Sequence, residues 1–99
     1  MRTMLRVTIP VESGNAAIQS GRLPQLMQRM MGELKPEAAY FTTDRGARTA
    51  YFFVDFKDIA DMPKIAEPFF MELNASVEFV PVMNAEDLQK GLSRIPGTK

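Results

Sequence analysis

Residues 38 to 56 read AAYFTTDRGARTAYFFVDF, and this stretch decides the fold. Both halves are rich in aromatic and other strand-favouring residues. Between them stand Asp44, Arg45 and Gly46, which are residue types typical of tight turns. The last of them, glycine, can adopt a positive φ angle without strain. The stretch therefore predicts a β-hairpin on which the rest of the chain packs.

One further strand is predicted on each side of the hairpin. Residues 2 to 9 alternate with the period of a half-buried strand. One of its faces carries Thr3, Leu5, Val7 and Ile9, and the other carries Arg2, Met4, Arg6 and Thr8. Residues 74 to 83 form the fourth strand, where Pro81 cannot donate to a neighbour and so indicates a sheet edge or a bulge.

Helices are predicted between these strands. A short one, capped by Ser13 or Asn15, ends before Gly21, and a second starts at Pro24. The second helix has an apolar stripe made of Leu23, Leu26, Met27, Met30, Met31 and Leu34. Residues 58 to 73 repeat the helical period, and Pro68 inside them predicts a kink or a break.

The element order predicts a single domain over residues 1–99. Asn84 and Asp87 have the spacing of a capping box and add a short helix after the fourth strand. The expected fold is an α+β, ferredoxin-like βαββαβ sandwich with this extra C-terminal helix, and its antiparallel sheet has the strand order 4-1-3-2. In that fold both main helices cover the same face of the sheet.

The face without helices carries a large apolar area. Its apolar members are Met4, Tyr40, Tyr51, Phe53, Val80 and Val82. Monomeric proteins seldom leave so much apolar surface in water. We therefore expect a homodimer through the sheet face, an organisation that resembles the dimeric α+β barrel proteins.

Four segments of the sequence give a closer resemblance, to one particular protein family. They are GRLP from Gly21, LKPEAAYF from Leu34, AEPFF from Ala66 and PVMNAEDLQKGL from Pro81. With them the chain resembles a family of short, uncharacterised bacterial proteins over nearly its full length. The resemblance implies a small α+β domain and brings no known activity.

The composition excludes several classes of function. Twelve basic residues balance twelve acidic ones, so we expect no nucleic-acid partner. The chain has no Cys and no His, which removes thiolate chemistry, zinc-thiolate sites and histidine relays, and we expect no metal and no cofactor. Its apolar runs are too short for a membrane span, and without a secretory signal pattern we expect a cytoplasmic protein.

Arg6 is the most informative candidate site residue, because it lies mid-strand in the expected central strand. Antiparallel pairing is expected to place it near Tyr51 and diagonal to Glu78. Two interpretations stay open. Arg6 anchors an anionic ligand in a pocket to which Tyr40 or Tyr51 supplies a hydroxyl group, or it forms a structural ion pair with Glu78.

Other polar residues have simpler explanations. Arg45 and Arg48 flank the turn and are expected to be solvated, and Glu67 and Glu72 lie too far apart to act as a pair. The sequence therefore favours a small homodimeric binding domain with a pocket for a small anionic or aromatic ligand. The alternatives are a cofactor-independent isomerase or monooxygenase of the dimeric α+β barrel type, and a protein-interaction subunit.

Overall fold

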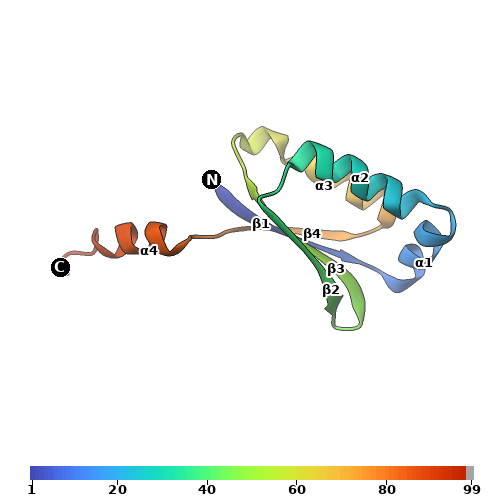
Figure 1. Ribbon diagram of the computed structural model, residues 1–99, viewed down its shortest axis with the longest axis horizontal. Coiled ribbons are helices and arrows are strands. Elements are labelled where there is room, and N and C mark those ends of the chain that lie inside the picture. Colours follow the sequence, from blue (N-terminus) through green and yellow to red (C-terminus); the bar gives the residue numbers. More distant parts are fainter. Residues whose placement is uncertain (98–99) are drawn as a thin grey trace.

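The computed structural model describes residues 1–97 (Figure 1). Its elements are β1 (Arg2–Ile9), α1 (Val11–Gln19), α2 (Arg22–Leu34), β2 (Ala38–Asp44), β3 (Ala47–Asp55), the 3₁₀ helix η1 (Ile59–Asp61), α3 (Met62–Leu73), β4 (Ser76–Pro81) and α4 (Ala85–Leu92). All strand pairs are antiparallel, and the sheet order is β2-β3-β1-β4. This is the predicted order 4-1-3-2 read from the other edge. The α+β class is confirmed, and the arrangement is consistent with a ferredoxin-like fold.

The hairpin closes through a two-residue turn. Arg45 has φ 54° and Gly46 has φ 78°, and two positive φ angles are what a type I′ turn requires. Asp44 belongs to β2 and pairs with Ala47, so the turn is one residue shorter than the sequence suggests. This turn fixes the register between β2 and β3.

The helix boundaries differ from the predicted ones at α1 and α2. α1 begins at Val11, directly after Pro10, and not at a Ser13 or Asn15 cap. The Ser13 hydroxyl instead donates to the Leu73 carbonyl oxygen at 2.6 Å, which ties α1 to the end of α3. Gly21, with φ 77°, separates α1 from α2. No helix within residues 1–97 has both the length and the apolar character needed to cross a membrane.

α3 continues through Pro68, so a break there, one of the two predicted outcomes, does not occur. Proline removes one backbone hydrogen bond and crowds the preceding turn. On either side of it, however, Ala66 and Phe69 are buried on the sheet, as is Leu73 one turn later. We attribute the continuity to this apolar burial, which offsets the lost bond.

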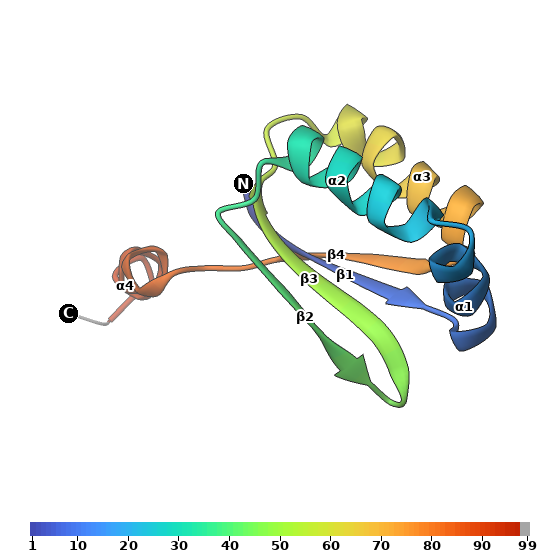
Figure 2. The same cartoon turned by 45° about the vertical axis from the view of Figure 1, so that its right-hand side comes forward.

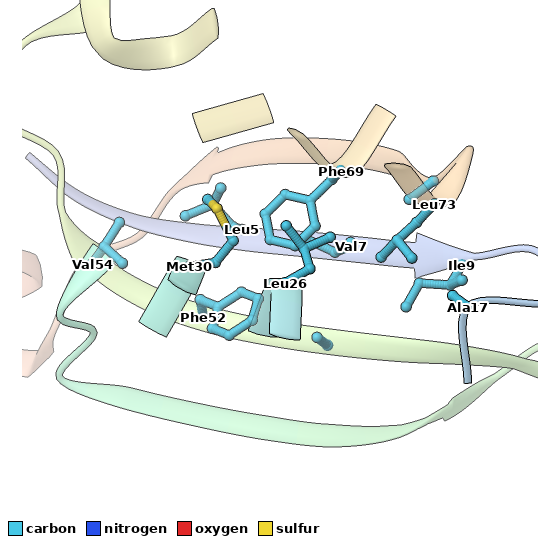
Figure 3. Packing of buried hydrophobic residues seen from close by; sticks show 12 residues of the cluster. Leu5, Val7, Ile9, Ala17, Leu26, Met30, Phe52, Val54, Phe69 and Leu73 are labelled. Carbon is cyan, nitrogen blue, oxygen red and sulfur yellow. The ribbon is translucent and has the colours of Figure 1, made fainter. Parts of the chain in front are cut away.

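The core lies between the sheet and the helices α2 and α3, which cover the same face of the sheet (Figure 2). Its largest fully buried side chains are Leu5, Val7, Leu26, Met30, Phe52, Phe69 and Leu73 (Figure 3). The Phe52 and Phe69 rings stack with their centres 6.3 Å apart, which joins β3 to α3. The opposite face of the sheet has no helix over it.

α4 stands apart from this two-layer body. A short extended segment carries it beyond the end of the sheet (Figures 1 and 2). The molecule measures 57 × 28 × 18 Å, and its radius of gyration is 16.1 Å. A compact chain of this length has a radius of gyration of about 13 Å. The projecting helix therefore makes the single chain unusually elongated.

Two glycine substitutions test the turn geometry. Gly46→Ala should lower the free energy of unfolding by about 1–2 kcal/mol, because a Cβ atom disfavours the left-handed region. Gly32→Ala is the control. Gly32 lies within α2 with open space around it, so alanine there should raise stability by roughly 0.5–1 kcal/mol. Urea denaturation measures both, and an unchanged stability in Gly46→Ala would contradict the type I′ turn.

Candidate functional site

The four predicted site residues form one row across the open face of the sheet. Tyr40 on β2 pairs with Tyr51 on β3. Tyr51 pairs with Arg6 on β1, and Arg6 pairs with Glu78 on β4. Each strand thus contributes one member, and the sheet brings together residues that are up to 72 positions apart in the chain.

Two further rows flank the Arg6 row. The row toward the start of β1 is apolar and consists of Ala38, Phe53, Met4 and Val80. The row toward the hairpin turn carries hydroxyl groups and consists of Thr42, Thr49, Thr8 and Ser76. The Arg6 row therefore lies between apolar surface and a line of hydroxyl groups.

Arg6 is held by both of its neighbours in the row. Its Nη1 atom lies 3.3 Å from Oε2 of Glu78, and its guanidinium carbon lies 5.9 Å from the centre of the Tyr51 ring. Glu78 is directly opposite Arg6 and not diagonal to it, which corrects the predicted pairing. The predicted ion pair forms, but the two side chains are 34% and 52% exposed, so this pair is not buried in the single chain.

One donor of Arg6 remains unused. Its Nε atom is buried and has no hydrogen-bond partner among the described residues. A buried donor without a partner costs about 1–3 kcal/mol. The Nε donor is therefore unsatisfied in the single chain, and an acceptor in the groove would reach it only after the Arg6 side chain shifts.

A groove runs from this row to the hairpin turn. Its volume is about 620 Å³, and it is lined by Arg6, Thr8, Asp44, Arg45, Ala47 and Glu78. Arg45 is exposed, as predicted, but it also brings a second guanidinium to the groove and makes no ion pair within residues 1–97. The sequence predicts Arg45 only as a solvated turn residue. The turn type is the signal that could have placed it beside the open face.

The two tyrosines of the row differ in their surroundings. The Tyr51 hydroxyl group donates to Oδ2 of Asp44 at 3.3 Å. Tyr40 is 63% exposed, and its ring meets Phe53 edge to face with the centres 6.4 Å apart. Tyr51 is thus held in place, while Tyr40 presents an aromatic surface to solvent.

Other polar candidates have structural partners on the helix side. The Arg48 guanidinium donates to Oδ1 of Asn15 at 3.0 Å, and Glu72 forms an ion pair with Arg29. Glu67 is exposed on α3. None of these side chains lies in the groove.

Charged groups also gather at the far end of the sheet, where Arg2 lies 3.0 Å from a Glu37 oxygen and 2.8 Å from an Asp87 oxygen. Close by, the Met1 amino group donates to Asp55 at 3.1 Å. That hydrogen bond and the positive charge lower the pKa of the Asp55 carboxyl group below its ordinary value. All of these side chains contact water, and their charges are paired with one another.

Within residues 1–97, no three His, Cys, Asp or Glu side chains are grouped closely enough to hold a metal ion. No family model matches the chain, and no curated protein or solved structure matches it either. The resemblance to a bacterial protein family therefore stays a prediction.

A double-mutant cycle of Arg6→Met and Glu78→Gln measures the coupling within the ion pair. Because both side chains keep contact with water, the coupling in the free energy of unfolding should stay below about 1 kcal/mol when the chain is monomeric. Chemical denaturation at low protein concentration gives the four values. The half-exposed Arg29–Glu72 pair is the matched control and should give a coupling of similar size. A coupling of about 3 kcal/mol or more would contradict the half-exposed geometry.

Proposed function

We propose that this chain is a small homodimeric binding domain whose open sheet face holds a small anionic or aromatic ligand. The observation that carries the proposal is the row of Tyr40, Tyr51, Arg6 and Glu78. In it, a guanidinium with a buried, unused donor lies between an aromatic ring and a carboxylate. No helix covers this face.

The chemistry of the row suits a planar acid. Arginine binds carboxylates with two parallel hydrogen bonds, and its Nε atom is one of the donors used in that geometry. Arg45 adds a second guanidinium to the same groove, where Asp44 and Glu78 balance the formal charge, and Thr8 adds a hydroxyl group. The exposed ring of Tyr40 supplies an aromatic surface. Tyr40 is not among the residues that line the groove, so a ligand with one carboxylate at Arg6 would have to extend its ring along the row to reach Tyr40.

The exposed surface supports a dimer. A compact monomer of 11.1 kDa exposes about 5,700 Å² of surface, whereas this chain exposes 6782 Å². The excess, roughly 1,100 Å², exceeds the area of about 800 Å² that each partner buries in a standard interface. Sheets that pack face to face lie about 10 Å apart, so a second copy would turn the groove into an enclosed pocket.

One hydrogen bond favours the catalytic alternative. The Tyr51 phenol next to the Asp44 carboxylate is a pair of groups that can pass a proton. Such a pair would serve a cofactor-independent isomerase or monooxygenase of the dimeric α+β barrel type. A binding role needs no proton transfer, and in it the same bond only orients the Tyr51 ring beneath Arg6. Binding is therefore the function that the geometry supports best.

Adjacent residues on β2 test the dimer face. Tyr40 lies on the open face and Phe41 on the helix face, and their exposed fractions are 63% and 61%. Tyr40→Asp should raise the dissociation constant of the dimer at least about 100-fold, because it places an unpaired carboxylate in the interface. Phe41→Asp should leave the dimer intact. Sedimentation equilibrium at micromolar concentration measures both, and a monomeric wild-type protein would refute the proposal.

Benzoate tests the ligand class. In hundredfold excess over its dissociation constant it would stabilise the folded protein by about 2.7 kcal/mol, which raises the melting temperature by at least about 10 °C for a chain of this size. Arg6→Met should lose this shift. Arg29→Met removes a half-exposed ion pair from the helix layer and should keep it. An equal shift in wild type and in Arg6→Met would show that benzoate does not bind at Arg6.

A further inference from the structure

We propose that α4 of one copy packs over the hairpin end of the open face of a second copy and forms one wall of the ligand groove. The inference rests on the proposed function, because it takes the dimer and the groove as given. It adds the residues that the partner copy contributes. Three features of the chain lead to it.

The first feature is the exposed apolar side of α4. Leu88 and Leu92 are four residues apart and lie on the same side of α4, and Ile95 follows three residues after the helix ends. They are 46%, 50% and 48% exposed, and Met83 in the preceding segment is 66% exposed. An amphipathic helix normally turns such a side toward a packed surface.

The second feature is the limited support that α4 receives from its own chain. The Asn84 side chain accepts from the Asp87 backbone at 2.8 Å, and the Asp87 side chain accepts from the Asn84 backbone at 3.2 Å. Apart from this capping box, Asp87 is tied to the body through Arg2 at 2.8 Å. A helix of eight residues is marginal in water even with good caps. Packing from another molecule would supply the missing stabilisation.

The third feature is the position of α4 relative to the hairpin. β4 and β2 are opposite edges of the sheet. α4 leaves the β4 edge at the end where Pro81 pairs with Thr3, whereas the turn at Arg45 and Gly46 lies at the other end of the β2 edge. The helix and the turn thus project from diagonally opposite corners (Figures 1 and 2).

A two-fold dimer brings these corners together. When two sheets pack face to face at right angles, the two-fold axis runs along one diagonal of the sheet, and the two corners off that axis exchange places between the copies. With the axis along the diagonal that joins the other two corners, the corner that carries α4 lies over the partner's hairpin corner. Each α4 then lies over the partner's hairpin, and both contacts form at once. The surface that receives α4 contains Asp44 and Ala47, which line the groove of about 620 Å³, and Thr42, which lies two residues after Tyr40 on β2.

Cross-linking tests this contact in the full-length chain, which has no native cysteine. We expect a chain carrying Leu88→Cys, mixed with a second chain carrying Thr42→Cys, to give a cross-linked dimer with a short bismaleimide. Thr43→Cys is the control, because Thr43 is also an exposed threonine but lies on the helix face of the same strand. Equal yields from Thr42→Cys and Thr43→Cys would overturn the proposal. So would a cross-link at high dilution within one chain carrying Leu88→Cys and Ile59→Cys, which would show α4 folded back on its own body.

A second measurement separates this inference from the proposed function. Leu88→Asp should raise the dissociation constants of the dimer and of benzoate at least tenfold. Gln89→Asp, which introduces the same charge at the next position and off the apolar side, should change neither. If Leu88→Asp changes neither constant while Tyr40→Asp still abolishes the dimer, the role of α4 is wrong and the binding dimer stands. If wild type is monomeric and does not bind benzoate, both fail.

Discussion

The register of β1 between β3 and β4 is the constraint on which the rest of the structure depends. It sets Leu5 and Val7 under the helices, and it sets Arg6 on the opposite face between Tyr51 and Glu78. Because side chains alternate along a strand, a slip of one residue would place Arg6 in the core and Leu5 in the open row. The free energy of burying the apolar side therefore also fixes the position of the polar row.

Most of the fold could be predicted because two local signals agree along the chain. The period of two in residues 2 to 9 and the turn residues of the hairpin fix the strands, and short connections leave one sheet order. The residue at which α1 starts and the continuity of α3 through Pro68 could not be predicted from local signals of this kind. The Ser13 hydroxyl is used by the distant Leu73 carbonyl, and Pro68 is held inside a helix by core contacts that no local pattern reveals.

The sequence predicts which residues form the candidate site, but it does not predict how they are placed relative to one another. Arg6 was identified because a mid-strand charge in a central strand needs an explanation, and Tyr51 and Glu78 followed from the strand order. Whether Glu78 is opposite or diagonal depends on the register of β4, which is set by packing rather than by a short turn. The role of Arg45 depends on a two-residue turn that the sequence suggested to be one residue longer.

Assembly and ligand binding are expected to be linked through the Arg6 row. In the single chain the ion pair contacts water, so its net contribution to stability is small. In the proposed dimer the two open faces exclude water, which strengthens every charge interaction in the row. An anion held by Arg6 between the two faces would therefore bind more tightly in the assembled state than in the single chain. By mass action the bound anion would then favour the dimer, so ligand binding in the groove and dimerisation through the interface would be thermodynamically linked.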